Sequence, residues 1–194
     1  MKKLVVFVML LAASLLLSEM GWAQEEKPKC LEAIEFLTGF GWGKLRQRED
    51  YHLIPFIVAF DFNLKPLTKK FNFNPSSLLQ FQIEPFISFI FSPDNNVETG
   101  TSFLLKMGLL PQTSKLQPFI FAGLGMAYMT QHTLEQSTQF NFTEQAGIGV
   151  HYFIRKNIAL TLEGRYRHLS NASIDHPNAG INTQFALAGI SYRF

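Results

Sequence analysis

The chain has only one cysteine, Cys30, among its 194 residues. A lone cysteine excludes an intramolecular disulfide framework and a zinc site built on several thiolates. Metal-binding spacings such as HExxH are also missing from the five histidines, which are His52, His132, His151, His168 and His176. The sequence therefore predicts no metal ion.

Charged residues are scarce as well. They make up 16% of the chain, whereas apolar residues make up 47%, and a usual charged share is roughly a quarter. The formal net charge is only +2, and no basic run is longer than the Lys2/Lys3 and Lys69/Lys70 pairs. This pattern excludes a nucleic-acid footprint, and it indicates that something other than water meets part of the surface.

One apolar run stands out at the N-terminus. Leu4 to Leu17 follows two lysines and precedes Gly21-Trp22-Ala23, which offers small residues at the positions that a signal peptidase inspects. We expect residues 1–23 to be a cleaved signal peptide and residues 24–194 to form one exported domain. The rivals are an uncleaved anchor and a lipoprotein, but the run is shorter than the roughly 20 residues that span a bilayer, and Cys30 lies too far away to be lipidated.

Alternation with a period of two dominates the rest of the chain. From Leu79 to Ser92 the odd positions are apolar and the even ones are largely polar, which is typical of a β-strand with two different faces. Phenylalanine, present 20 times, is favoured in strands. Similar alternation predicts seven further strands, near 34–42, 54–62, 99–109, 117–129, 139–154, 157–170 and 182–194.

Eight strands could form a soluble sandwich or a closed barrel, and export favours a barrel that is apolar outside. The chain also ends Ile190-x-Tyr192-x-Phe194, which resembles the C-terminal assembly signal of bacterial outer-membrane barrels. We predict an all-β fold, an eight-stranded antiparallel transmembrane β-barrel of the bacterial outer membrane. The predicted lumen contains the charged residues Glu84, Lys106, Glu163, Arg165 and Arg167.

The same pattern places several glycines on the inward face, where we expect them to make room for the luminal Arg and Glu side chains: Gly39, Gly41, Gly43, Gly123, Gly125, Gly147 and Gly149. An eight-stranded barrel is just wide enough for its own side chains, so a solute pore is not expected. With a periplasmic N-terminus, the connections near 44–50, 93–98, 130–138 and 171–181 would face outward.

His168 and Ser170 lie near the outward end of the seventh strand. They are two residues apart, so both project from one face, and their parity with Leu162 and Tyr166 makes it the lipid-facing one. In the preceding hairpin, the register that matches apolar faces puts Glu144 opposite His168. A carboxylate, an imidazole and a hydroxyl then cluster as in serine hydrolases. The alternative is a set of wet, inert polar residues beyond the hydrocarbon.

Strand geometry gives the depth of this cluster. Position 168 lies ~28 Å above the turn at 156 for strands tilted by ~45°. The apolar band of such a barrel is only about 25 Å tall. The cluster would therefore lie at the outer-leaflet boundary, where ester linkages of a lipid are found.

The segments His168-x-Ser170-Asn171-Ala172 and Pro177-Asn178-x-Gly180, with a last strand ending Tyr192-Arg193-Phe194, resemble the PagL-type lipid A 3-O-deacylases. These are outer-membrane barrels of eight strands that hydrolyse the ester-linked acyl chain at position 3 of lipid A. The resemblance implies an ester hydrolase with Ser170 as nucleophile and His168 as general base. It also implies an oxyanion hole from Asn178 and the backbone of Asn171 and Ala172.

One position departs from the family pattern. The family's acidic residue sits early in the last strand, where spacing gives Asn182 in this chain. Either Glu144 supplies the negative charge, or the Asn182 amide orients His168, or the chain is an inactive lipopolysaccharide-binding or structural barrel. The resemblance implies lipid A in lipopolysaccharide as the partner and no cofactor, and a homodimer is left open.

Overall fold

The structure is a computed structural model that describes residues 30–45 and 49–194. The predicted signal peptide, residues 1–23, lies outside these residues, so its cleavage stays a prediction. Among the described residues, no helix has the length and apolar character needed to cross a membrane.

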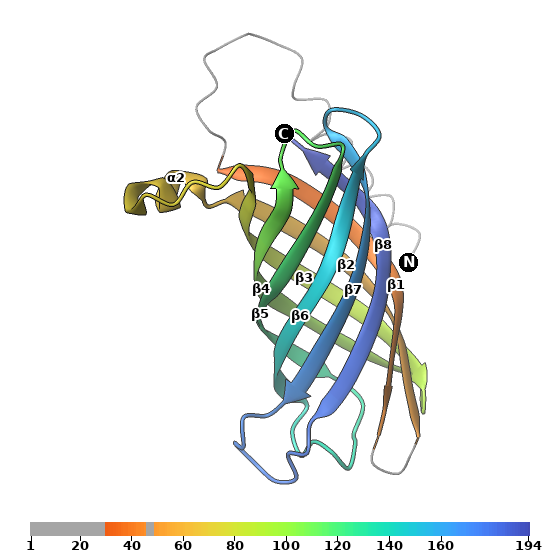
Figure 1. Cartoon of the computed structure of the whole chain (residues 1–194). Coiled ribbons are helices and arrows are strands. Elements are labelled where there is room, and N and C mark those ends of the chain that lie inside the picture. The colour runs from red at the N-terminus through yellow and green to blue at the C-terminus, as the bar shows by residue number, and fades with distance from the viewer. Residues whose placement is uncertain (1–29, 46–48) are drawn as a thin grey trace.

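Eight antiparallel strands form one closed barrel in which each strand pairs with its neighbours in sequence and β1 pairs with β8 (Figure 1). Each strand has 13 to 16 residues, more than the 9–11 that cross a bilayer at a tilt. The predicted fold is confirmed, with strand bounds β1 Leu31–Lys44, β2 Asp50–Asn63, β3 Ser77–Ser92, β4 Asn96–Pro111, β5 Leu116–Met129, β6 Phe140–Phe153, β7 Ile158–Ser170 and β8 Ile181–Arg193.

The two ends of the barrel differ (Figure 1). One, the terminal end, carries Cys30 and Phe194, together with the short helix α2 (Lys65–Thr68) and the 3₁₀ helix η1 (Lys69–Phe71) between β2 and β3. The other, the loop end, carries the connections 130–139 and 171–180. Because the strands alternate in direction, the last residues of β7 lie at the loop end.

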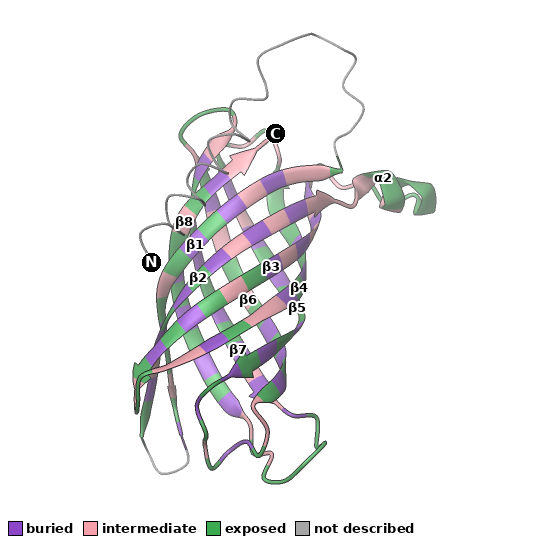
Figure 2. Cartoon of the chain, turned by 180° about the vertical axis from the view of Figure 1, so that it is seen from behind, coloured by how far each residue is buried: buried purple, intermediate pink, exposed green. Residues whose placement is uncertain are grey.

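Burial alternates along the strands, as the striped ribbons of Figure 2 show. The outer face carries an apolar belt of large exposed side chains, which includes Phe36, Phe56, Phe89, Leu105, Leu124 and Leu162. The inner face buries the five charged residues predicted for the lumen, Glu84, Lys106, Glu163, Arg165 and Arg167. This arrangement is the inverse of a soluble barrel.

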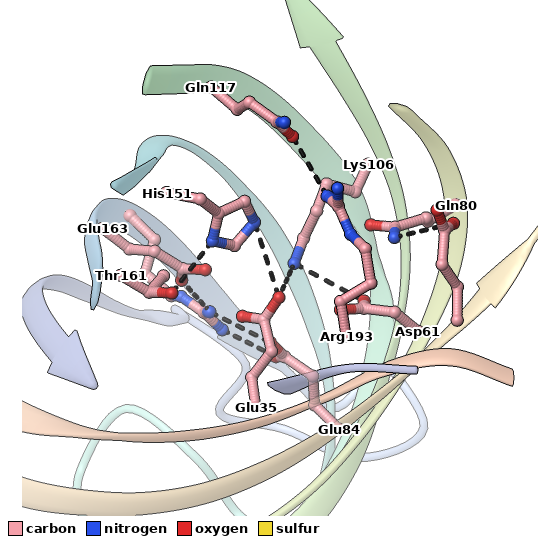
Figure 3. A network of polar contacts seen from close by, with 12 residues as sticks. Glu35, Asp61, Gln80, Glu84, Lys106, Gln117, His151, Thr161, Glu163 and Arg193 are labelled. Atoms are coloured by element: carbon pink, nitrogen blue, oxygen red, sulfur yellow. Dashed lines mark hydrogen bonds and ion pairs between the residues drawn. The ribbon is translucent and has the colours of Figure 1, made fainter. Parts of the chain in front are cut away.

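Ion pairs join the luminal charges across the barrel (Figure 3). Lys106 Nζ lies 2.8 Å from Glu35 Oε1 and 3.5 Å from Asp61 Oδ1. Arg165 binds Glu84 with two parallel hydrogen bonds of 2.8 and 3.1 Å, and it also contacts Glu163. Fork geometry of this kind satisfies both charges at once, which a buried pair requires.

Nearer the loop end, Arg167 binds Glu98 with hydrogen bonds of 2.7 and 3.0 Å, and the Tyr51 hydroxyl donates to the same carboxylate at 3.2 Å. A cavity beside Arg165 and Arg167 has a volume of only about 20 Å³, close to the space of one water molecule. Side chains therefore fill this part of the lumen.

The luminal packing differs from the expectation in one respect. Aromatic rings occupy part of the space beside the inward glycines: a Cβ on Gly147 would meet the Phe121 ring as well as Arg165, and one on Gly149 would meet Phe119. The inner face also carries an apolar cluster that includes Leu37, Leu53, Ile90, Met129, Leu169, Ile181 and Phe185. Glycine thus makes room for phenylalanine as well as for the charged side chains.

Candidate functional site

The end of β7 presents His168 and Ser170 on the outer face of the barrel. The intervening Leu169 and the preceding Arg167 are buried in the lumen, whereas Tyr166 is exposed. His168 and Ser170 are both half-buried. They therefore point away from the bore and lie at the loop-end edge of the apolar belt, on the face that the sequence pattern predicts.

His168 lies between one candidate partner on each neighbouring strand. Its Cα pairs with that of Glu144 in β6, as the hairpin register predicts, and with that of Asn182 in β8. His168 Nδ1 is 2.7 Å from Asn182 Oδ1. Glu144 is exposed and forms no hydrogen bond or ion pair with His168. Of the two candidates, only the amide forms a hydrogen bond with the imidazole among the described residues.

With the Asn182 amide oxygen facing the ring, this contact sets the protonation pattern of His168. An amide oxygen only accepts hydrogen bonds, so Nδ1 must carry the proton that His168 donates to Asn182. In the neutral ring Nε2 is then an acceptor, which is the state that a general base for a hydroxyl needs. Ser170 lies two residues along the same face, and its hydroxyl forms no hydrogen bond with His168 or with any other described residue.

The backbone of Gly180 packs closely against the imidazole of His168. Its φ of 76° lies in the left-handed region, which glycine adopts without steric cost. A Cβ placed there would overlap His168 Cε1 and lie 2.9 Å from Nε2. Only a residue without a side chain lets the ring occupy this position, and Gly180 therefore helps to set the direction of Nε2.

The three candidate oxyanion residues have different surroundings. The Asn171 backbone N–H donates to Asn178 Oδ1 at 2.9 Å, and the fully buried Asn171 side chain donates to Ser137 Oγ and to the Asp175 carbonyl oxygen, each at 3.0 Å. Asn178 Nδ2 makes a longer bond of 3.4 Å to Ser173 Oγ. The Ala172 N–H has no acceptor among the described residues.

The chain turns sharply directly after Ser170. Ala172 and Ser173 both have positive φ, 53° and 61°, and the Ile174 N–H closes the turn on the Asn171 carbonyl oxygen at 3.1 Å. Positive φ is uncommon for residues with a Cβ and costs about 1–2 kcal/mol per residue. Surrounding contacts must therefore hold this turn, which presents the Ala172 N–H near Ser170.

The connection 130–139 supplies further contacts. The Ser137 N–H donates to the Pro177 carbonyl oxygen at 2.9 Å, and the Ala179 N–H donates to the Glu135 carbonyl oxygen at 2.8 Å. Gln136 and Asn178 form an isolated β-bridge between these hydrogen bonds. The two connections thus form a short paired segment that positions Asn178 and leads into Gly180.

Sequence reasoning did not identify two parts of this arrangement. Gly180 belongs to the Asn178-x-Gly180 motif, and this motif is the signal that could have marked a backbone close to a functional ring. Ser137 and its neighbours carry no motif, and only the folded structure brings them beside Asn171. Across the described ranges, no cluster of three or more His, Cys, Asp or Glu side chains could hold a metal ion.

Comparison with known structures places the fold among outer-membrane barrels. The outer membrane enzyme PagL matches with a TM-score of 0.60 and 16% identity, over 80% of this chain and 97% of that one. Neisserial surface protein A matches with a TM-score of 0.62 and 12% identity, over 84% and 96%. OprG from Pseudomonas aeruginosa matches with a TM-score of 0.50 and 11% identity, over 84% and 96%. Identities this low show the fold alone.

The family comparison is more specific. No curated protein sequence matches the chain significantly. The family model described as lipid A 3-O-deacylase (PagL) matches residues 54–191, a range that includes β3 to β7, most of β8 and every candidate site residue. Since this match covers more than half of the chain, the protein belongs to the lipid A 3-O-deacylase (PagL) family of the bacterial outer membrane.

Proposed function

We propose that this chain hydrolyses the ester-linked acyl chain at position 3 of lipid A by a serine-esterase mechanism. Ser170 is the nucleophile, His168 the general base and Asn182 the residue that orients the imidazole. The observation that carries the proposal is the 2.7 Å contact between His168 Nδ1 and Asn182 Oδ1. It leaves Nε2 as the acceptor beside a serine on the same outer face.

In the first half-reaction, Ser170 Oγ attacks the ester carbonyl carbon while its proton passes to His168 Nε2. The carbonyl oxygen becomes an oxyanion. The ester bond then breaks, the Nε2 proton passes to the departing sugar 3-oxygen, and the acyl group stays on Ser170. A water molecule, deprotonated by Nε2, attacks this acyl-enzyme, and the fatty acid leaves as Ser170 regains its proton.

The oxyanion requires hydrogen-bond donors that are not already used. We assign this role to the Ala172 N–H, which has no acceptor in the described part of the chain, and to Asn178 Nδ2, whose bond to Ser173 is 3.4 Å long. The Asn171 N–H is bound to Asn178 Oδ1 instead. Asn171 therefore acts as a structural residue that holds Asn178 in place.

Glu144 has a secondary role in this proposal. A cross-strand pair of this kind has Cβ atoms about 5 Å apart, so its carboxylate can favour the imidazolium without a direct hydrogen bond. We place the loop end at the outer leaflet, which contains lipopolysaccharide, and the terminal end in the periplasm. The site at the edge of the apolar belt then meets the ester linkages of lipid A.

Mass spectrometry of lipid A from cells expressing the wild type or Ser170→Ala tests the proposal. We expect a product with one acyl chain fewer only with the wild type, at equal amounts of folded barrel. Identical acylation in the two strains would contradict it. That result would favour the alternative of an inactive barrel, which the amide at position 182 keeps open.

A further inference from the structure

The connection between β2 and β3, residues 64–76, leaves the barrel sideways at the terminal end (Figure 1). α2 and η1 extend outward from the rim instead of crossing the barrel mouth. The other two connections at this end need only residues 112–115 and 154–157 to join their strands. Closing the barrel therefore does not account for the length and direction of this segment.

Hydrogen bonds keep this segment in one shape. The Lys65 N–H donates to Asn63 Oδ1 at 2.9 Å, and the Thr68 N–H donates to the Leu64 carbonyl oxygen at 2.9 Å. The Phe73 N–H returns to the Thr68 carbonyl oxygen at 3.1 Å. The segment is thus a folded projection with its own backbone bonds.

Its large apolar side chains are unburied. Phe71 is 77% exposed, Leu67 54% and Phe73 49%, and neither short helix buries a residue (Figure 2). The segment begins two residues after Phe62, an outward-facing residue that pairs with Phe81 of β3. Its apolar side chains therefore continue the apolar belt at its terminal edge, and three such groups together indicate a surface that water does not cover.

The charges of the segment have one sign. Residues 64–76 contain Lys65, Lys69 and Lys70 and no acidic residue. Lys65 Nζ donates to Gln112 Oε1 at 2.6 Å, and partial burial lowers its pKa, so this lysine belongs to the barrel rim. Lys69 and Lys70 are exposed. Two cations that form no ion pair with any described residue, beside exposed aromatic rings, fit a membrane interface with anionic headgroups.

The other two connections at this end carry charges of the same sign. The three connections at the terminal end contain six Lys or Arg residues and no Asp or Glu, with Lys115, Arg155 and Lys156 completing the set. The four loop-end connections contain four acidic residues, which are Glu49, Asp94, Glu135 and Asp175, against two basic ones, Arg46 and Arg48. The terminal-end connections thus have a net positive charge, which is complementary to an anionic lipid surface, whereas the loop-end connections have a net negative charge.

We propose that residues 64–76 form an interfacial anchor that binds the phospholipid leaflet at the terminal end of the barrel. Leu67, Phe71 and Phe73 enter the acyl-chain boundary, and Lys69 and Lys70 contact headgroup phosphates. The anchor goes beyond the deacylation proposed above and is independent of it, since it needs only a membrane-embedded barrel. The substitutions that test the anchor leave Ser170 and His168 unchanged, so loss of the anchor and loss of deacylation can be told apart.

Depth measurement by spin labelling tests the apolar half of this proposal. On a Cys30→Ser background, a nitroxide is attached to Phe71→Cys or to the matched control Asn74→Cys, and each barrel is reconstituted into vesicles of phosphatidylethanolamine and phosphatidylglycerol. We expect the label at 71 to collide more with oxygen than with a water-soluble nickel chelate, and the label at 74 to show the reverse.

Two results would overturn the anchor. A label at 71 that is as accessible to nickel as the label at 74 would place the segment in water. Spin–spin broadening at 71 that disappears on dilution with unlabelled protein would show a second copy of the chain on this surface instead of lipid.

Headgroup selectivity tests the charged half. Spin-labelled phosphatidylglycerol and phosphatidylcholine report the preference of the barrel for anionic lipid, which we expect to fall at least about twofold in Lys69→Gln/Lys70→Gln. The control is Lys44→Gln at the loop end, where Asp50 lies 4.0 Å away, and it should keep the wild-type ratio. An unchanged ratio in the double variant would overturn the headgroup contact.

Discussion

The residue that decides how His168 works is Asn182. An amide can hold the imidazole through Oδ1, but it can also turn and donate through Nδ2, which would stabilise the wrong tautomer. A carboxylate has no such alternative, and it also stabilises the imidazolium that forms during attack. In the proposed mechanism, an amide at position 182 therefore supports catalysis less strongly than a carboxylate would.

We expect Asn182→Asp to raise kcat at least tenfold, because a carboxylate selects the Nδ1-protonated ring and favours its charged form. Asn182→Ala should lower kcat about tenfold or more, and Glu144→Gln should have a smaller effect because Glu144 forms no hydrogen bond or ion pair with the ring. Release of fatty acid from lipid A by the purified barrel gives the three rates. A larger loss for Glu144→Gln than for Asn182→Ala would make Glu144 the functional partner.

Gly180→Ala should lower kcat strongly while the barrel stays folded. The new methyl group would overlap the imidazole, and alanine is also strained at a φ of 76°. Ala179→Gly, one residue earlier, is the matched control and should retain most of the activity. If Gly180→Ala kept wild-type turnover, the close packing of Gly180 against the imidazole would have no part in setting the direction of Nε2.

At the scale of elements, the short turn from Asn171 to Ile174 carries one of the two proposed oxyanion donors, the Ala172 N–H. Its two residues with positive φ raise the energy of the folded loop, and the paired segment between connections 130–139 and 171–180 holds it in place. Strain of this kind is common where a backbone group must point at a ligand.

Ala172→Gly should relieve part of this strain and stabilise the folded barrel by up to about 1 kcal/mol. The gain is limited because glycine also increases the entropy of the unfolded chain. Urea unfolding followed by tryptophan fluorescence in vesicles gives the free energy of unfolding. If Ala172→Gly instead lowered the free energy of unfolding, as glycine does in an unstrained loop, the positive φ of Ala172 would not be a source of strain.

Alternation along the chain was enough to predict all eight strands and the lipid-facing side of His168 and Ser170. It also gave the register that puts Glu144 opposite His168. The strands and their faces depend only on residues close together in the sequence, and the Glu144–His168 pairing depends only on the register of one hairpin. The choice between Glu144 and Asn182 depends on which side chain reaches Nδ1, and the role of Gly180 depends on a loop that folds back over the ring. Neither can be predicted from the alternation of apolar and polar residues along a strand.

For the whole molecule, the luminal network joins strands that are distant in sequence. Lys106 of β4 binds Glu35 of β1 and Asp61 of β2, and Arg165 of β7 binds Glu84 of β3. Alternation predicted five of the charged residues of this lumen, but it did not identify Glu35, Glu98 or the apolar cluster. The partners of these charges could not be predicted, since the pairing depends on the tilt and closure of the barrel.

Lys106→Met should destabilise the barrel by about 3–5 kcal/mol, because it leaves buried carboxylates without their counter-charge. The triple variant Lys106→Met/Glu35→Gln/Asp61→Asn should recover part of this loss, since it removes the uncompensated charges too. Denaturant unfolding of the reconstituted barrels measures both. Equal stability of Lys106→Met and the wild type would mean that the network contributes little to holding the barrel closed.

Labelling with an alkyl fluorophosphonate tests the central claim most directly, because this reagent reacts with a serine hydroxyl that a neighbouring base activates. After reaction with the purified barrel, peptide mass spectrometry locates the adduct. We predict one adduct on Ser170 in the wild type, a much slower reaction in His168→Ala, and a faster one in Asn182→Asp. An unlabelled Ser170 in a barrel that still deacylates lipid A, or labelling that does not depend on His168, would contradict the proposed mechanism.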